Sequence, residues 1–220
     1  MTARGMLSRQ RIVDAAAAVA DRTGLASVSM RSVGAELRVE AMSLYHHVSN
    51  KEALLDALAE WAFVQIDLPE IGDPWRDAMV QRAESARTVL RAHPWALGML
   101  ESRPVPGPAL LRHHDRVLGC LMTEGFSAAL ATHAFSTIDA FVYGFALTEA
   151  GLPFTPGEGA EAAFASQVAP PPEDYPYLAR SLAELLHGGD YAFEDEFRNG
   201  LELILDGLAQ RRMSIGTPWQ

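Results

Sequence analysis

Residues 40–48 read E-A-M-S-L-Y-H-H-V, and they follow S-M-R-S-V-G-A-E-L at 29–37 after a gap of only two residues. Each stretch has the length of a short helix, so the gap leaves room only for a tight turn. Leu44 and Val48 are four residues apart, which puts them on one helical face where they can pack inward. The polar and aromatic side chains of the same stretch then face outward. Two short helices joined by a tight turn are typical of a helix-turn-helix unit, whose second helix enters the major groove of DNA.

Signals for helix ends lie on both sides of this unit. Ser8 is a good N-cap for a preceding helix, and Gly24 ends that helix. Downstream, Ser49 and Glu52 have the S-x-x-E spacing of a capping box ahead of an apolar helical stretch. Three helices followed by a fourth, connecting helix predict a helix-turn-helix domain over residues 1–66.

The remainder of the chain, residues 67–220, is also helical in pattern. Pro69, Gly72 and Pro74 break the chain at its start. Residues 151–176 hold six prolines and three glycines and predict a mobile loop. Apolar residues recur at helical period at about 75–93, 109–124, 127–150, 177–186 and 194–211, with short helices predicted at about 95–102 and 160–167. Because no segment alternates convincingly between apolar and polar residues, we predict an all-α fold: a three-helix helix-turn-helix domain followed by a larger helical domain.

The composition limits the kinds of protein that this chain can be. Its 220 residues are 49% apolar, which is enough for a packed core and argues against disorder. A single cysteine, Cys120, excludes an intrachain disulfide. The longest stretch without Asp, Glu, Lys or Arg, Gly125–Ile138, is too short to cross a bilayer, and the N-terminus has no secretory-signal pattern. We therefore expect a soluble, cytoplasmic protein that does not span a membrane.

The charges are distributed unevenly along the chain. Residues 1–51 carry seven Arg and Lys against four Asp and Glu, a net charge of +3, whereas the other 169 residues carry a net charge of −13. A basic segment joined to an acidic body is compatible with binding of a polyanion. A surplus this small also arises by chance, so the charge alone leaves both interpretations open.

Two groups of motifs resemble one known family. The first domain resembles the DNA-binding domain of TetR-family transcriptional repressors through I-V-D-A-A at 12–16, S-M-R-S-V-G-A-E-L at 29–37 and S-L-Y-H-H-V-S-N-K-E-A-L-L-D-A-L at 43–58. The body resembles the ligand-binding domain of the tetracycline-repressor subgroup through Trp75, A-H-P-W at 92–95, S-R-P at 102–104, G-P-A-L-L at 107–111 and E-G-F-S at 124–127. The resemblance covers residues 8–150, and beyond them only the helical pattern is similar.

The resemblance implies a set of DNA contacts in the first domain. Ala41 and Met42 cannot make the bidentate hydrogen bonds that read bases, so contacts with thymine methyl groups, or an operator unlike the tetracycline operator, follow as hypotheses. The family usually has Gly where Arg38 stands, and a positive φ there costs Arg ~1 kcal/mol, which a phosphate contact can offset. The implied contacts are Met30, Arg31, Arg38, Ala41, Met42, Ser43, Tyr45, His47 and Lys51.

The resemblance also implies a small-molecule pocket in the body, although Met and aromatic residues at helical spacing are more often plain core. The tetracycline repressor holds a drug–magnesium complex with two histidines and an asparagine. Asp67, Arg82 and Met99 align near those positions, and only Asp67 suits magnesium, so magnesium–tetracycline is not expected. The residues that we expect to line the pocket are Trp95, Met99, His114, Val117, Leu118 and Phe135.

Metal sites and catalysis receive little support from the sequence. The pairs His46–His47 and His113–His114 invite a zinc interpretation, but adjacent histidines point apart on a helix and no fitting ligands complete the set. No nucleophile elbow, glycine-rich phosphate loop or H-E-x-x-H motif occurs. We expect neither an enzyme nor a bound metal or cofactor.

Two functional hypotheses remain. The first is a ligand-responsive repressor that binds a palindromic operator as a homodimer and is released by an apolar or aromatic small molecule. Its dimer would form through helices at about 127–150 and 194–211, by way of Phe135, Ile138, Val142, Phe145, Phe197, Leu201, Ile204 and Leu208. The alternative is a ligand-independent DNA-binding regulator whose body serves only dimerisation or protein partners. The loop at 151–176 can gate a pocket in the first hypothesis and has no assigned role in the second.

Overall fold

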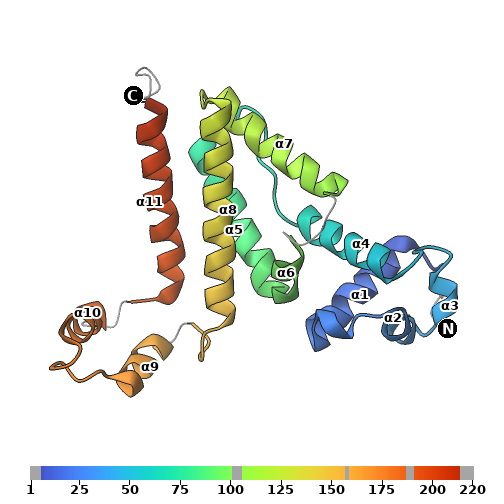
Figure 1. Cartoon of the computed structure of the whole chain (residues 1–220), viewed down its shortest axis with the longest axis horizontal. Coiled ribbons are helices and arrows are strands. Elements are labelled where there is room, and N and C mark those ends of the chain that lie inside the picture. The colour runs from blue at the N-terminus through green and yellow to red at the C-terminus, as the bar shows by residue number, and fades with distance from the viewer. Residues whose placement is uncertain (1–5, 101–105, 157–158, 187–190, 214–220) are drawn as a thin grey trace. The chain divides into compact units, whose positions relative to one another are not determined.

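The computed structural model describes residues 6–100, 106–156, 159–186 and 191–213 (Figure 1). All regular structure within these ranges is helical, which confirms the all-α fold class. The helices are α1 (Arg9–Thr23), α2 (Met30–Leu37), α3 (Ala41–Leu44), α4 (Lys51–Val64), α5 (Trp75–Ala92), α6 (Leu97–Leu100), α7 (Pro108–Thr123), α8 (Ala128–Ala150), α9 (Ala160–Val168), α10 (Pro176–Leu186) and α11 (Phe193–Met213), with 3-10 turns η1 (Leu25–Ser27) and η2 (Pro94–Ala96).

The chain divides into two compact units, Met1–Leu147 and Thr148–Gln220. The first unit holds α1–α7 and most of α8, and the second holds α9–α11. The helix-turn-helix segment therefore shares a unit with the helices after it, because α4 packs against α6 and α7 and α1 packs against η2. The sequence predicted a different division, into domains of residues 1–66 and 67–220. That division stays a prediction.

Local capping residues set the ends of the first helices. The Ser8 hydroxyl accepts a hydrogen bond from the backbone N–H of Arg11, and Gly24 ends α1 with a φ of 79°. Ser29 and Ser32 form a reciprocal capping box at the start of α2. The prediction that Ser49 caps the fourth helix is wrong: Asn50 occupies the N-cap, and its side-chain oxygen accepts from the N–H of Ala53 at 2.8 Å. Asn and Ser are comparably good caps, so the S-x-x-E pattern alone placed the cap one residue early.

The turn between α2 and α3 depends on two backbone features. Arg38 has φ 56° and ψ 44°, and it is the only non-glycine residue with positive φ in the described ranges. The left-handed conformation costs a residue with a Cβ roughly 1 kcal/mol. At Gly34, an added Cβ would lie 3.0 Å from the carbonyl oxygen of Val39. A side chain at Gly34 would therefore push α2 away from the start of α3.

The first four helices share an apolar core. Leu44 and Val48 are buried in it, as their spacing predicted. Met99, from α6, is also buried against this core, and Trp95 packs on it from the preceding turn. The core thus extends beyond the helix-turn-helix segment into the helices that follow.

The body helices follow the predicted boundaries closely. Ser127 accepts a hydrogen bond from the N–H of Leu130 at the start of α8. The single helix expected at 95–102 is instead the turn η2 followed by α6, and the S-R-P motif at 102–104 lies outside the described residues. In the second unit, the buried carboxylate of Glu161 accepts from the N–H of Phe193 at the start of α11. A carboxylate at a helix N-terminus is stabilising, because it satisfies a backbone donor and complements the helix dipole.

Most of the apolar residues expected to pair two chains are already covered within a single chain. Five of the eight are buried, namely Ile138, Val142, Phe197, Leu201 and Leu208, and the other three, Phe135, Phe145 and Ile204, are half-buried. Among the described residues of the same helices, the exposed large apolar side chains are Leu147 of α8 and Leu203 and Met213 of α11, with 67%, 75% and 76% of their surface accessible. No helix of the described residues is long and apolar enough to cross a membrane.

Candidate DNA-binding surface and effector site

Most of the predicted DNA contacts lie on the surface of the α2–α4 segment. Met42, at the second position of α3, is 72% exposed. Ala41 and Ser43 on either side of it are half-buried. Arg31, Arg38, Tyr45, His47 and Lys51 are exposed.

Met30 is the exception among these residues. Its side chain is 7% exposed and belongs to the core of the first four helices. Only its backbone N–H, at the first position of α2, remains for a contact with DNA. A contact of Met30 with DNA stays a prediction, and it is restricted to the backbone because the apolar side chain is buried in the core.

Charge on this surface is concentrated at the ends of helices. Lys51 is the first residue of α4, where the helix dipole and the unpaired backbone N–H groups also favour an anion. Arg22 on α1, by contrast, forms an ion pair with Glu36 on α2. That pair links two helices, and its cation is correspondingly less available to a phosphate.

The six predicted effector residues do not form one group. His114 on α7 and Phe135 on α8 pack edge to face, with ring centroids 4.4 Å apart. Val117 is buried and Leu118 half-buried one turn further along α7. Trp95 instead donates its indole N–H to the carboxylate of Asp21 on α1 at 2.6 Å. Met99 is buried against the core of the first four helices, so these two residues lie at the contact between the helix-turn-helix segment and α5–α6.

An aromatic cluster forms that contact. Trp61 on α4 stacks on Trp95, with 6.0 Å between centroids, and packs edge to face on His93 at 4.9 Å. Each polar edge of the cluster meets a carboxylate of α1: Trp61 donates to Asp14 at 3.0 Å, and the Nδ1 of His93 lies 2.8 Å from Asp21. The cluster couples α1, α4 and the end of α5 to one another.

A buried polar cluster lies beside His114 and Phe135. Arg82 on α5 donates through Nε to the Nε2 of His113 on α7 at 2.6 Å, and through Nη2 to the carboxylate of Asp139 on α8 at 2.5 Å. The phenol of Tyr143 donates to the other oxygen of Asp139 at 3.4 Å. The Phe135 ring lies 5.4 Å from the centre of the Arg82 guanidinium. The sequence suggested only that Arg82 aligns near a ligand-contacting position; nothing in it indicated His113 or Asp139 as partners.

Arg82 dictates the protonation of His113. A guanidinium only donates hydrogen bonds, so Nε2 of His113 must accept and its proton must sit on Nδ1. Burial lowers the pKa of His113 from 6.5 to about 3, with the positive charge of Arg82 and then that of His114 adding to the effect. His113 is therefore neutral at physiological pH.

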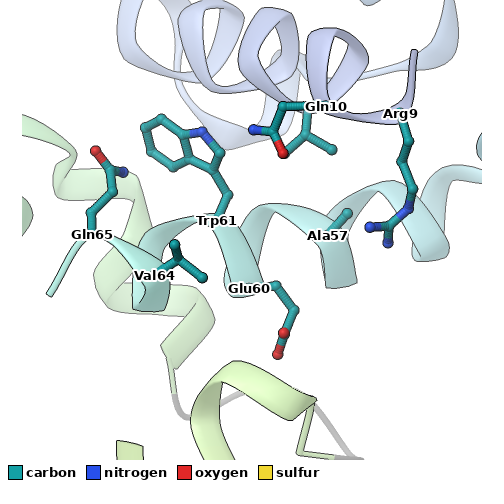
Figure 2. A pocket seen from close by; sticks show the side chains of 8 residues that line it. Arg9, Gln10, Ala57, Glu60, Trp61, Val64 and Gln65 are labelled. Atoms are coloured by element: carbon teal, nitrogen blue, oxygen red, sulfur yellow. The ribbon is translucent and has the colours of Figure 1, made fainter. Parts of the chain in front are cut away.

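Two clefts border α4. One, of about 500 Å³, lies between α1 and α4 and is lined by Arg9, Gln10 and Trp61 among others (Figure 2). The second, of about 340 Å³, lies between α4 and the start of α7 and includes Phe63 and Met99. Met99 is the only one of the six predicted effector residues that lines either cleft.

Glu60 stands between these two clefts and lines both. Figure 2 shows its side chain pointing away from α1. Its carboxylate accepts from the N–H of Ala109 at the start of α7. This contact, which the sequence did not suggest, ties the middle of α4 to α7.

The residue types that usually hold a metal ion do not cluster in the described part of the chain. Nowhere in that part do three His, Cys, Asp or Glu side chains come together in a group that could hold one. Asp67, the one aligned residue that suits magnesium, is exposed, and its backbone N–H donates to the hydroxyl of Ser85.

Comparison with known proteins finds a matching family for the helix-turn-helix segment and another for the helical body. Residues 12–58 match the family of bacterial regulatory proteins called the tetR family, and residues 68–212 match the tetracyclin repressor-like C-terminal domain. These matches together cover the helix-turn-helix segment and most of the helical body.

Individual proteins are similar over nearly the whole chain. An HTH-type transcriptional regulator of Saccharopolyspora erythraea is 32% identical over 93% of this chain and 85% of its own length. The HTH-type transcriptional repressor DrrR1 of Streptomyces coeruleorubidus is 34% identical over 94% of this chain and 80% of its own. The structure of ActR from Streptomyces coelicolor in complex with actinorhodin superposes with a TM-score of 0.74 at 26% identity, over 94% of this chain and 99% of that one. The chain belongs to the TetR family of transcriptional regulators, which are DNA-binding proteins and not enzymes.

Proposed function

We propose that this regulator is a ligand-responsive repressor that binds a palindromic operator as a homodimer and leaves it when a small molecule binds the body. One observation carries the proposal: α4 belongs to both functional regions. Lys51 at its start lies on the proposed DNA-binding surface. Nearer its other end, Glu60 accepts a hydrogen bond from α7, and Trp61 is part of the aromatic cluster. A displacement in the body is thereby transmitted along a single helix of 14 residues, roughly 20 Å long.

The exposed residues of α2–α4 divide into two roles. Arg31, Ala41, Met42 and Ser43 approach base edges, with the methyl and thioether groups suited to thymine methyls and not to hydrogen-bonded readout. Arg38, Tyr45, His47 and Lys51 contact phosphates, and these contacts position the protein without specifying a base. Met30 contributes through its backbone N–H, since its side chain is buried.

Dimerisation supplies the palindromic specificity. Two recognition helices must be separated by about 34 Å, or a multiple of it, to read successive half-sites. The helices proposed to pair two chains are those at 127–150 and 194–211. Because most of the residues first expected at this interface are buried within one chain, we propose that exposed residues such as Leu147 and Leu203 form it. We assign the first domain to residues 1–66 and the dimerisation and effector domain to residues 67–220.

The effector is an apolar or aromatic small molecule held among α5, α7 and α8. Two observations support this place: the packed rings of His114 and Phe135, and the buried polar cluster beside them. The structure of ActR in complex with actinorhodin, a chain similar to this one, supports a small-molecule effector as such. Because the regulator acts on chromosomal DNA, we place it in the cytoplasm.

Operator binding and its release test the proposal together. The operator is first selected from genomic fragments that flank the gene, and its affinity is measured by fluorescence anisotropy at fixed salt. An apolar and aromatic library is then screened by thermal shift, where a ligand at 100 times its Kd adds ~2.7 kcal/mol of stability. A hit must weaken operator binding, and by linkage it must bind the protein–operator complex more weakly by the same factor. Hits with equal affinity for free and DNA-bound protein would favour the alternative, a ligand-independent regulator whose body serves only dimerisation or protein partners.

A further inference from the structure

Two hydrogen-bond donors in the buried cluster have no acceptor. Among the described residues, neither Nη1 of Arg82 nor Nδ1 of His113 has a hydrogen-bond partner, although both atoms are buried. Only 2% of the surface of each residue is accessible. A buried donor without a partner costs about 1–3 kcal/mol, so such groups usually mark a bound molecule or a functional site.

The cluster is held in place by its other contacts. Asp139 fixes one end of the guanidinium and His113 accepts from Nε, so Arg82 cannot turn Nη1 toward another partner without breaking two hydrogen bonds. His113 is fixed in the same way, because the contact with Arg82 keeps its proton on Nδ1. The orientations of both donor N–H groups are therefore already fixed before a ligand binds.

The charge of the cluster restricts what it can bind. The positive charge of Arg82 is balanced by Asp139, and His113 is neutral. An anionic ligand at Arg82 would bring a second negative charge next to the carboxylate of Asp139 in a buried site, which is costly. A neutral oxygen, such as the carbonyl of a ketone, quinone or amide, accepts a hydrogen bond without that cost.

The surroundings of the cluster are aromatic. Phe135 faces the Arg82 guanidinium and packs against His114. Phe63 of α4 packs edge to face on His113, with 5.7 Å between centroids. Flat apolar walls with a few fixed donors are typical of sites for aromatic ligands.

The geometry points to Arg82 and His113 as the polar end of the effector site, which takes a neutral aromatic molecule bearing a carbonyl oxygen. This inference rests on the proposed function and adds the chemical class of the effector to it. Phe63 also links the cluster to α4, because it packs directly on His113. A ligand bound at His113 would therefore be connected through Phe63 to the helix that begins with Lys51.

The test compares three probes that share one ring system: 9-fluorenone, fluorene and fluorene-9-carboxylate. Their Kd values for the full-length protein are measured by equilibrium dialysis. We expect fluorenone to bind about tenfold or more tightly than fluorene. This is the gain in affinity expected from one hydrogen bond to a charged or buried donor. The carboxylate should bind no more tightly than fluorene.

Two variants remove the donors without leaving a buried charge. His113→Gln keeps an acceptor for Nε of Arg82 but has no N–H at the Nδ1 position. The double variant Arg82→Gln with Asp139→Asn removes the ion pair as a whole, which avoids stranding either charge. Each variant removes one of the two donors, so each should bring the ratio of fluorene Kd to fluorenone Kd closer to one. His133→Gln, on the exposed face of α8, is the matched control and should retain the ratio of the unmodified protein.

Several results would overturn the inference: equal affinities for ketone and hydrocarbon, tightest binding of the carboxylate, no binding of any probe, or an unchanged ratio in His113→Gln. Equal affinities would assign the two donors a structural partner such as an internal water. None of these results bears on operator binding. If a different molecule still releases the operator, the proposed function stands and only the effector class is wrong; if the unmodified protein binds no operator, the proposed function itself fails.

Discussion

The carboxylate of Glu60, in the middle of α4, accepts a hydrogen bond from the backbone N–H of Ala109 in the first turn of α7, with 2.8 Å between the two atoms. A Cβ added at Gly107 would lie 1.9 Å from the other carboxylate oxygen, so glycine is needed for this close approach. A negative charge here also complements the dipole of α7. The contact makes Glu60 a cap of α7, through a backbone N–H 49 residues further along the chain.

Removing this cap should destabilise the first unit. Glu60→Ala should lower the free energy of unfolding by about 1–2 kcal/mol, because a partly buried helix N-terminus loses its acceptor, and Glu60→Gln should cost less because an oxygen remains. Urea denaturation measures both. Val64→Ala, at an exposed position on the same helix, is the control and should change stability by less than about 0.5 kcal/mol. An equal effect of all three variants would show that Glu60 has no special role.

Replacing Arg38 by glycine should weaken DNA binding without lowering the stability of the fold. Arg38→Gly relieves the left-handed strain, so its free energy of unfolding should stay the same or rise by up to about 1 kcal/mol. Its operator affinity should nevertheless fall, and the slope of log affinity against log salt should decrease by about 1, because a phosphate contact is lost. Arg38→Lys keeps both the strain and the charge and serves as the control. A glycine variant that binds the operator as well as the unmodified protein would remove Arg38 from the interface.

Lys51 should contribute equally to specific and random duplexes. A phosphate contact carries no sequence information, so Lys51→Ala should weaken both complexes by the same factor and reduce the salt slope by about 1. Anisotropy titrations at several salt concentrations measure both quantities. Lys51→Arg keeps the cation at the start of α4 and should behave nearly as the unmodified protein. A loss restricted to the operator would instead make Lys51 a base-reading residue.

The oligomeric state should depend on exposed positions of α8 and α11. Leu203→Glu, alone and with Leu147→Glu, should shift the protein to monomers and weaken operator binding, because charges are costly at a buried interface. Sedimentation velocity at micromolar concentration reports the state, and Leu203→Ala is the apolar control. Leu201→Glu tests the chain's own core instead and is expected to unfold it. A monomeric unmodified protein would contradict the proposed dimer.

The depressed pKa of His113 predicts a pH dependence of stability. The unfolded chain takes up a proton on His113 near pH 6.5, whereas the folded chain does so only near pH 3. The unfolded state therefore binds more protons between these values, so this residue's contribution makes the protein less stable as pH falls from 6.5 toward 3. Relative to His113→Gln, the unmodified protein should lose about 2 kcal/mol between pH 7 and pH 5. Denaturant unfolding at both pH values measures the difference, and His133→Gln should show the full pH dependence; an unchanged dependence in His113→Gln would be the contrary result.

The helix-turn-helix segment was predictable because its determinants are local. Ser8, Gly24 and Ser29 set helix ends through neighbouring backbone groups, and Leu44 and Val48 share a face simply by their spacing. The same reasoning placed most body helices within a few residues. It failed at Ser49 and Asn50, where two adjacent residues are both good caps and only the backbone geometry chooses between them.

The tertiary structure alone decided where side chains from distant helices meet. Met30 lies on a short helix but points into the core, and Trp95 binds a carboxylate 74 positions away. Arg82 meets His113 and Asp139 across 31 and 57 residues. Periodicity assigns a residue to a face of its own helix; it does not determine which other helix covers that face. The sequence by itself thus determined the family, the helices and the DNA-binding segment, while the buried donors that we assign to the effector depend on the packing of α5, α7 and α8.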